Sequence, residues 1–584
     1  MIETPTEPEL RGHRARWQIQ PRLPDEIRRE LGDRSVMAAH LLYCRGFRSL
    51  EDIQGFFEAK PVSHDPFLMP DMEAAVSRIA LARQQGEKVA VYGDFDCDGI
   101  TSAAVLQETL TSLGLDPIVH IPERVDGHGL HPETLAMLQG RGVSLVVTAD
   151  CGITAIEEVI VAKGLGLDVI ITDHHEPRPD GSLPDCLVVA PTRLHSEYPF
   201  RSLCGAGVVY KLAQALATRL PGALDPSDLL DLVAMGTVAD VVPLRDENRS
   251  LVISGIERLR ETRRPGLRAL FRAAEVDPSR IDPISIGYYL APRINAANRM
   301  ASPQLAYELL TATDATEADR LAERLSDLNR QRQALVDTML AMLLEEFGDP
   351  LALAEAVVAG ERSPILVTLG DWPAGISGLL ASKLVDVYGL PAFVATRDGE
   401  LVIASARGAA GARIDEILEW CEASRPGGLF DGYGGHSRAG GFRVQADRWS
   451  ETQVILADQA GRIEIDALGA VLEVDAEVSL RQLNFHAGKL IHSLAPFGME
   501  FAEPLFLARN VVLRGKQPTV GDKHVRVRLS QSNAFAGGMF FNAPSEFLEL
   551  PLDTAMDVLF HVSLNEWKGT LAVETQIRDW RIAE

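Results

Sequence analysis

The sequence predicts an α/β protein in which a doubly wound parallel sheet is joined by a long helix to a second α/β domain, with a C-terminal β-barrel after it. Three observations support this prediction. Short apolar strands alternate with helical patterns between residues 71 and 300, as in parallel α/β sheets. Residues 303–347 favour helix and contain no Gly and no Pro after position 303. Many short alternating strands follow residue 468, which indicates a small barrel.

Five strands are predicted in the first domain, namely KVAVYGD (88–94), DPIVHI (116–121), VSLVVTAD (143–150), LDVIITD (167–173) and DCLVVAP (185–191). Their Val and Ile runs indicate a sheet that is covered on both faces. Acidic residues stand where several of these strands end. Open α/β sheets place their sites at the carboxyl ends of the strands, so we expect the site there.

The chain divides into five parts: an N-terminal extension (1–70), the first domain (71–300), a connecting helix (301–350), the second α/β domain (351–460) and the barrel (468–584). The second domain is predicted from the strands SPILVTLG (363–370) and AFVATRD (392–398), and it closes with a Gly-rich segment, 427–442. The short strands of residues 468–584 make an OB-fold the expected type of barrel.

Bulk composition is typical of a globular protein. The N-terminus lacks the apolar region of a secretory signal, and no run of about 18 apolar residues predicts a membrane span. Six cysteines are scattered at 44, 97, 151, 186, 204 and 421 without a C-x-x-C pair, which favours a reducing cytoplasm. The net charge of −25 disfavours a nucleic-acid binder. Bound divalent metal would neutralise several acids, and a local basic groove can coexist with an acidic exterior.

The clearest chemical motif is Asp94-Phe95-Asp96-Cys97-Asp98-Gly99, directly after a predicted strand. Three carboxylates at every second position of a turn can converge on one or two hard cations. An EF-hand loop is the rival interpretation, but its twelfth position should be Glu and is Val105 here. It also needs a preceding helix, where this chain has a strand. A solvated acidic turn would explain this motif only if it stood alone.

Other candidate ligands follow further apolar segments: Asp150 ends VSLVVTAD, Asp173-His174-His175 ends the next strand, and Asp240 lies in MGTVADVVPL. Imidazole with several carboxylates suits Mn²⁺ better than zinc, and Mg²⁺ is the alternative. Adjacent histidines in extended backbone point to opposite faces, so we expect one to bind metal and its neighbour to face the substrate. Two metals that share a carboxylate could hydrolyse a phosphoester.

The motifs GDFDCDG, TADCGI, TDHHEP and GTVADVVPL resemble the four motifs of the DHH phosphoesterase superfamily, and GGHSRAGGF resembles the motif of its companion DHHA1 domain. Within that superfamily the chain resembles the RecJ family of single-strand-specific exonucleases. The segments IPERVDGHGL, YPFRSLCGAGVVYKL, VADVVPLRDENRSLV, APRINAANRM and LAPFGMEFAEPLF carry this likeness, from about residue 60 to the end. The chain departs from the family pattern at His128, where the family usually has Tyr, at Asn298, where it usually has Gly, at Ala190-Pro191, and at Pro373-Ala374.

The resemblance implies roles for individual residues. The metal ligands would be Asp94, Asp96, Asp98, Asp150, His174 and Asp240, and the catalytic pair would be Asp150 and His175, with His175 at the scissile phosphate. Arg293 and Asn295 would line the path of the DNA. Phosphates would be bound in the second domain by Ser405, Arg407, Gly434, Gly435 and His436.

The function expected from this resemblance is a 5′→3′ exonuclease of single-stranded DNA that uses Mn²⁺ or Mg²⁺, as one or two ions, in DNA repair and recombination. A single-strand-binding protein and a helicase are the candidate protein partners. One alternative is a phosphodiesterase of short oligonucleotides or cyclic dinucleotides, and a manganese pyrophosphatase is another, but such enzymes usually lack a barrel. A non-catalytic replication scaffold is the third alternative, but such scaffolds lose the metal-binding residues that this chain keeps.

Overall fold

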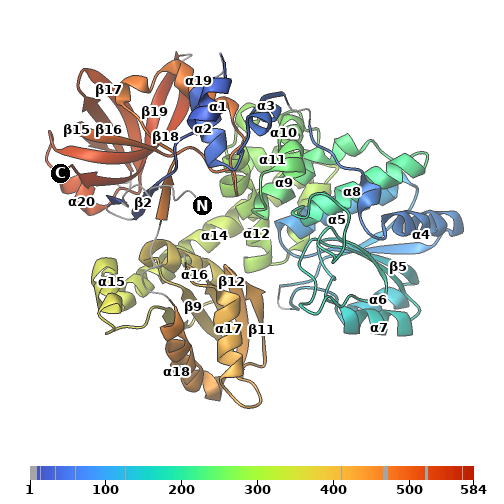
Figure 1. Ribbon diagram of the computed structural model, residues 1–584. Coiled ribbons are helices and arrows are strands. Elements are labelled where there is room, and N and C mark those ends of the chain that lie inside the picture. Colours follow the sequence, from blue (N-terminus) through green and yellow to red (C-terminus); the bar gives the residue numbers. More distant parts are fainter. Residues whose placement is uncertain are drawn as a thin grey trace. The chain divides into compact units, whose positions relative to one another are not determined.

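A computed structural model describes residues 10–12, 15–32, 35–58, 61–124, 126–409, 411–463, 471–519, 524–567 and 570–583 (Figure 1). Contacts divide the chain into two compact units. The first unit combines Ala59–Ala334 with the short segment Pro496–Ala502, and the second combines Met1–Glu58, Leu335–Ala495 and Glu503–Glu584. No helix of the described residues has both the length and the apolar character needed to cross a membrane.

The first unit contains the predicted parallel sheet. Its strands are β3 (Lys88–Tyr92), β4 (Ile118–His120), β5 (Val143–Thr148), β6 (Asp168–Thr172) and β7 (Leu187–Val189), and their order is β4-β3-β5-β6-β7. Every neighbouring pair is parallel. The order reverses beside β3, which places a topological switch point between β3 and β5. The predicted fold class is confirmed.

Helices cover both faces of this sheet, as its apolar strands require. On one face, α6 (Pro132–Gly140) and α7 (Ile156–Gly164) pack on alternate residues such as Tyr92 and Val146. The intervening residues Val91 and Val147 are equally buried. The strands also contact α4 (Met72–Gln85), α5 (Cys97–Ser112) and α8 (Gly205–Arg219).

The rest of this unit is helical and contains α9 (Leu230–Ala239), α10 (Asp246–Arg260), α11 (Pro265–Ala273), the π-helix η4 (Ser285–Leu290), α12 (Ala291–Met300) and α13 (Gln304–Thr311). The helix predicted across 303–347 is interrupted, because α14 begins only at Ala315 and runs to Phe347. Ala312 is extended, and the Asp314 side chain accepts the Glu317 N–H at 2.9 Å. This capping bond satisfies the first turn of a new helix and explains the break.

The second unit holds a mixed sheet made of β8 (Leu366–Gly370), β9 (Ala392–Asp398), β10 (Leu401–Arg407), β11 (Gly432–His436) and β12 (Ala439–Gln445). The strand order is β11-β12-β10-β9-β8, and only β8 and β9 are parallel. Its helices are α15 (Pro350–Val358), α16 (Ala374–Tyr388), α17 (Ile414–Ala423) and α18 (Trp449–Gln459). The Gly-rich segment therefore forms a β-hairpin at the edge of a sheet.

The C-terminal strands close into a five-stranded barrel of β15 (Phe506–Pro518), β16 (His524–Gln531), β17 (Ala534–Phe541), β18 (Ala555–Trp567) and β19 (Thr570–Ile582). The pairing runs β15-β16-β17-β19-β18 and returns to β15, with β17 and β19 parallel. The short helix α20 (Ser545–Glu549) precedes β18. This Greek-key barrel confirms the predicted OB-fold.

The N-terminal residues pack with C-terminal ones inside the second unit. Strand β2 (Arg16–Ile19) pairs in parallel with β13 (Val471–Val474). The buried Trp17 indole donates to Asp579 at 2.7 Å. After α2 (Val36–Cys44), buried Arg45 pairs with Asp475 at 2.8 Å. Thus residues 16–58, which the sequence placed in an extension, contribute to this unit.

Candidate metal centre and phosphate-binding residues

The first group of candidate ligands lies on the turn between β3 and α5. Asp96 caps α5, because its side chain accepts the N–H groups of Asp98 and Gly99, each at 3.0 Å. Asp94 and Asp98 are 4% and 1% exposed. A strand precedes the turn, as expected, and an EF-hand would need a helix there. The capping bond folds the three carboxylates against the carboxyl edge of the sheet.

Asp98 is fixed by the beginning of α8. One oxygen accepts the Gly205 N–H at 2.6 Å, and the other accepts the Ala206 N–H at 2.9 Å. Two glycines make room for the carboxylates. A Cβ on Gly205 would lie 2.4 Å from Asp150 Oδ1, and a Cβ on Gly236 would lie 2.6 Å from Asp98 Oδ1. These glycines are therefore required by close approach, a role that their surroundings in the sequence did not indicate.

Asp150 follows β5 in the left-handed backbone region, with φ of 69°. Few residues other than Gly adopt this conformation, and Asp and Asn are among the exceptions. The Asp150 N–H donates to the Thr172 carbonyl at 3.0 Å, which ties the turn to the end of β6. Its Oδ1 atom is buried and accepts no hydrogen bond within the described structure. A buried carboxylate oxygen of this kind suits a cation.

His174 lies at the centre of the cluster. Its Nε2 atom is 3.1 Å from Asp150 Oδ1, 3.6 Å from Asp240 Oδ2 and 3.9 Å from Asp98 Oδ2. Asp240 reaches this position from the C-terminal end of α9. The structure therefore brings the predicted ligands together from four segments of the chain.

Crowding and burial change the acidity of these groups. Burial and the neighbouring Asp96 raise the pKa of Asp98 to about 7. Burial and the charge of Asp98 raise the pKa values of Asp150 and Asp240 well above the ordinary value. Burial lowers the pKa of His174 to about 3, which keeps its imidazole neutral. Carboxylates that repel one another beside a neutral imidazole favour a divalent cation.

The Asp173 carboxylate binds protein groups. Its Oδ1 atom accepts from the His174 N–H at 2.7 Å and from His175 Nδ1 at 2.7 Å, and its Oδ2 atom accepts the Ile153 N–H at 2.8 Å. Burial alone would lower the pKa of His175, but the Asp173 hydrogen bond and nearby carboxylates raise it to about 9. Asp173 thus orients His175, a role that sequence analysis missed although both residues stand in one motif.

The two histidine rings do not point to opposite faces, so that prediction is wrong. Strand β6 ends at Thr172, and the chain bends at His175, so the alternation of a regular strand does not apply to the two histidines. Their ring centroids are 4.4 Å apart. His128 also reaches this place, with its Nδ1 atom 3.0 Å from Asp94 Oδ1 and its ring centroid 4.9 Å from that of His175.

Among the described residues, three overlapping groups have ligand atoms that could share a cation: Asp94, Asp96 and Asp150; Asp98, His174 and Asp240; and Asp150, His174 and His175. Asp150 belongs to two of these groups. Carboxylate oxygens with imidazole nitrogens fit Mn²⁺ or Mg²⁺. The donor set therefore fits one ion or two ions that share Asp150.

The predicted DNA-path residues lie on α12 and make contacts inside the protein. Arg293 donates from Nε to Ser326 Oγ at 3.0 Å and from a terminal nitrogen to the Tyr289 carbonyl at 2.6 Å. The side-chain oxygen of Asn295 accepts the Cys97 N–H at 2.9 Å, which links α12 to the Asp-containing turn.

The predicted phosphate-binding residues lie on two strands of the second unit that both pair with β12. Ser405 and Arg407 are on β10, opposite Gly441 and Ala439. The other three, Gly434, Gly435 and His436, are exposed on β11. A Cβ on Gly435 would lie 2.4 Å from the Ala439 carbonyl oxygen, whereas a Cβ on Gly434 would meet nothing within 4 Å. Gly435 is therefore fixed by hairpin packing, and Gly434 leaves open space.

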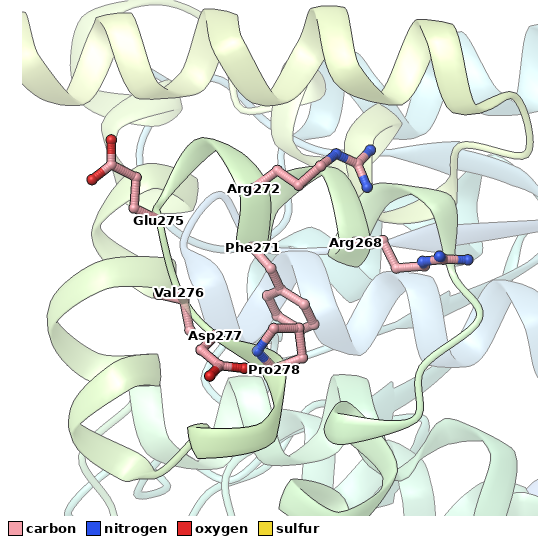
Figure 2. Close-up of a pocket in the computed structure, with 7 residues that line it drawn as sticks. All are labelled: Arg268, Phe271, Arg272, Glu275, Val276, Asp277 and Pro278. Atoms are coloured by element: carbon pink, nitrogen blue, oxygen red, sulfur yellow. The ribbon is translucent and has the colours of Figure 1, made fainter. Parts of the chain in front are cut away.

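A pocket of about 440 Å³ lies away from these residues, on α11 and the turn that follows it (Figure 2). It is lined by Arg268, Phe271, Arg272, Glu275, Val276, Asp277 and Pro278. Arg272 forms an ion pair with Asp319. None of the predicted site residues lines this pocket, so it is not the candidate metal centre.

Family models match two parts of the chain. Residues 88–237 match the DHH family, N-terminal domain, and residues 474–579 match the RecJ OB domain. The chain is also similar to the single-stranded-DNA-specific exonuclease RecJ of Bacillus subtilis (strain 168). The two are 35% identical over 579 residues, which cover 97% of this chain and 71% of the relative.

Solved structures of RecJ proteins also resemble this chain. The crystal structure of RecJ from Thermus thermophilus in complex with Mn²⁺ has a TM-score of 0.82 and 28% identity, and the match covers 97% of this chain and 80% of that one. For the complex of the same protein with Mg²⁺, the TM-score is 0.75 at 28% identity, with 97% and 78% covered.

Proposed function

The chain belongs to the RecJ family of single-stranded-DNA-specific exonucleases, and we propose that it hydrolyses phosphodiester bonds of single-stranded DNA in the 5′→3′ direction with Mn²⁺ or Mg²⁺. One observation carries this proposal. In this member of the family, the carboxylates of Asp98, Asp150 and Asp240 converge on the His174 imidazole. DNA repair and recombination are the processes that such an activity would serve.

The metal ligands would be six of the seven residues of the overlapping groups, namely Asp94, Asp96, Asp98, Asp150, His174 and Asp240. A bound divalent cation offsets phosphate charge and promotes the ionisation of water. The protein's own contribution is to fix the ligands in place before any ion binds. Asp98 is held by two amides and Asp96 by two others, so binding need not reorganise the turn.

His175 would contact the scissile phosphate, and Asp150 would share in catalysis. Asp173 accepts from His175 Nδ1 and so fixes the ring orientation. The second ring nitrogen is left for the substrate. The side chain is about one-third exposed, which gives a phosphate oxygen access to it.

The hairpin of β11 and β12, together with β10, would bind phosphates of the strand. Glycines let backbone N–H groups approach a phosphate closely, and the open space beside Gly434 permits this. An Arg guanidinium can grip a phosphate with two hydrogen bonds, which is the role proposed for Arg407. Ser405, Gly435 and His436 would complete the set. These residues belong to the part, 351–460, that we assign to a DHHA1 domain.

Residues on α12 would guide the strand toward the metals. Arg293 supplies the positive charge, while Ser326 and the Tyr289 carbonyl hold its guanidinium. The side-chain oxygen of Asn295 is already bonded to Cys97. Only its amide nitrogen is therefore proposed to face the DNA.

The alternative functions are less well supported. A phosphodiesterase of short oligonucleotides or cyclic dinucleotides would not need the barrel that matches the RecJ OB domain. A non-catalytic scaffold would not need three groups of metal-binding side chains. A single-strand-binding protein and a helicase remain proposed partners.

The test is nucleotide release from three substrates: a single strand, a blunt duplex and a cyclic dinucleotide, each with Mn²⁺, with Mg²⁺ and with a chelator. We expect metal-dependent release of mononucleotides from the single strand and resistance of the blunt duplex. Faster turnover of the cyclic dinucleotide than of the single strand would contradict the proposed substrate.

A further inference from the structure

The turn that carries Asp94 and Asp96 is held by two asparagines of α12. Asn298 Nδ2 donates to the Phe95 carbonyl at 2.8 Å, and Asn295 Oδ1 accepts the Cys97 N–H at 2.9 Å. Residues three apart lie on the same face of a helix. One face of α12 therefore binds the turn on both sides of Asp96.

The Asn298 amide is fixed by a second bond. Its Oδ1 atom accepts from the Arg124 guanidinium at 3.3 Å, and the same guanidinium lies 5.2 Å from the centre of the Phe95 ring. A carbonyl only accepts and a guanidinium only donates, so a single orientation of the amide satisfies both. Asn298 is 4% exposed, and a flipped amide would leave both partners unsatisfied.

The clamp acts on the backbone that carries the carboxylates. Phe95 joins Asp94 to Asp96, and Cys97 joins Asp96 to Asp98, so fixing these two peptide groups fixes where the carboxylates point. Asp94 is 4% exposed, and Asp96 follows two residues later on the same turn, so their ionised carboxylates lie close together. Without a restraint on the backbone, their repulsion would separate them.

We propose that Asn298, together with Asn295, is a positioning residue that holds the Phe95–Cys97 turn in the conformation that binds the divalent cation. This inference rests on the proposed metal centre. Groups that orient metal ligands from behind typically change metal affinity about 10- to 100-fold when they are mutated. Asn298 touches no ligand carboxylate through its two bonds, so its effect would pass through the backbone.

The experiment measures Mn²⁺ binding to the full chain without DNA, from the electron paramagnetic resonance signal of free Mn²⁺. Asn298→Ala removes both bonds, and Asn298→Leu removes them while it keeps most of the side-chain volume. The control is Asn329→Ala. Asn329 is equally buried, at 3% exposed, and within the described structure it makes no hydrogen bond to this turn.

Both Asn298 variants should bind Mn²⁺ about 10- to 100-fold more weakly than the wild-type chain, and Asn329→Ala should bind it normally. A purely structural loss would lower the melting temperature of all three variants and leave Mn²⁺ affinity unchanged, which would overturn this inference. The metal centre itself would then still stand. A wild-type chain that bound no Mn²⁺ would overturn the metal centre and this inference together.

Discussion

Individual residues of the candidate metal centre are held by backbone groups as much as by side chains. Asp98 accepts two amides at the start of α8, and Asp96 accepts two at the start of α5. Helix N-termini carry partial positive charge, which offsets part of the repulsion between the carboxylates. Burial, together with the charge of Asp98, still raises the pKa values of Asp150 and Asp240, and a bound cation would offset the repulsion between the carboxylates.

Replacing Asp150 or Asp240 by Asn should abolish metal-dependent hydrolysis. Asn keeps the side-chain shape and tolerates the positive φ of Asp150, so the fold should survive. Without metal, each variant should melt at no lower temperature than the wild-type chain, because one repelling charge is gone. Mn²⁺ should raise the melting temperature of the wild-type chain more than that of either variant.

Calorimetry with and without Mn²⁺, and an assay of nucleotide release, measure these effects. Asp185→Asn is the control, since that side chain is 91% exposed on the surface. Near-normal turnover of Asp150→Asn would show that the metal centre is wrongly assigned.

The candidate ligands could be named from the sequence because each lies in a short motif, and all of them except Asp240 follow a predicted strand. The expected orientation of His174 and His175 failed because it assumed that the strand continues past Thr172. The glycines at 205 and 236 could not be predicted, because the carboxylates that they accommodate come from distant segments. A close contact between residues that are far apart in the chain leaves no pattern in the sequence around either residue.

At the level of elements, the barrel could be predicted from the sequence, but which of its aromatic residues are exposed could not. The alternation of apolar and polar residues predicted the strands, and the many short strands predicted an OB-fold. In the sequence, the basic residues Lys523, Arg526 and Arg528 stand close to Phe535, Phe540 and Phe541, which suggests a surface for single-stranded DNA. Phe540 is 1% exposed and packs in the core against Phe547, whereas Phe535 and Phe541 are 69% and 46% exposed. Lys523 lies outside the described residues.

The outer face of β16 and β17 should bind single-stranded DNA. Arg526 and Arg528 are exposed there, paired in register with Met539 and Gly537, and Phe535 lies on the same hairpin. An aromatic that stacks on a base contributes roughly 1–3 kcal/mol. Phe535→Ala combined with Arg528→Ala should therefore weaken binding of a long strand about 10-fold or more, while hydrolysis of a short oligonucleotide is spared.

Fluorescence anisotropy with a long labelled strand, in an Asp150→Asn background that prevents hydrolysis, measures this affinity. Phe485→Ala is the control, because Phe485 is 45% exposed on α19 (Phe485–Ser493), outside that hairpin. Equal affinity of the double variant and the wild-type chain would exclude this face as a DNA surface.

A partly buried histidine should make the barrel sensitive to acid. His561 on β18 donates from Nδ1 to the Pro504 carbonyl at 2.8 Å, and burial lowers its pKa from 6.5 to about 4. Because the folded chain binds this proton less readily than the unfolded chain, stability is lost as pH falls from about 6.5 to about 4. His561→Gln removes the titrating group, so its melting temperature should fall less over that interval.

Calorimetry of the full chain between pH 7 and pH 4, on the transition that contains the barrel, gives the melting temperature of the wild-type chain and of His561→Gln as two curves against pH. They should converge as the pH falls. Curves that stay parallel would show that His561 does not contribute to acid sensitivity.

On the scale of the whole molecule, the order of elements along the chain differs from their grouping in space. One unit is assembled from three segments, and the Trp17 bond to Asp579 joins residues 562 positions apart. Local patterns predicted the sheets and barrel, because each is specified by nearby residues. They could not predict that β2 pairs with β13, since both strands are short and lie at opposite ends of the sequence.

The direction of hydrolysis should depend on a terminal phosphate bound by the second unit. An enzyme that releases mononucleotides must recognise a chain end, and a 5′-phosphate carries more negative charge than the phosphodiesters of the strand. Arg407 could bind such a group with two hydrogen bonds, beside amides of the glycine hairpin. A 5′-phosphorylated single strand should therefore lose a 5′ label before a 3′ label. Arg407→Ala should raise KM for that substrate, while Mn²⁺ binding stays normal.

The substrates are one strand labelled at either end, with and without a 5′-phosphate, and release of label is followed over time. Arg397→Ala is the matched control, because Arg397 is exposed on β9 of the same sheet, opposite Val402. Its KM should not change. If Arg407 recognised the strand only as a polyanion, its loss would raise KM equally with and without the 5′-phosphate. Since only the terminal group distinguishes these two substrates, a selective change in KM ties Arg407 to the end of the chain. Earlier release of the 3′ label would reverse the proposed polarity, although the proposed metal centre of the first unit would be unaffected.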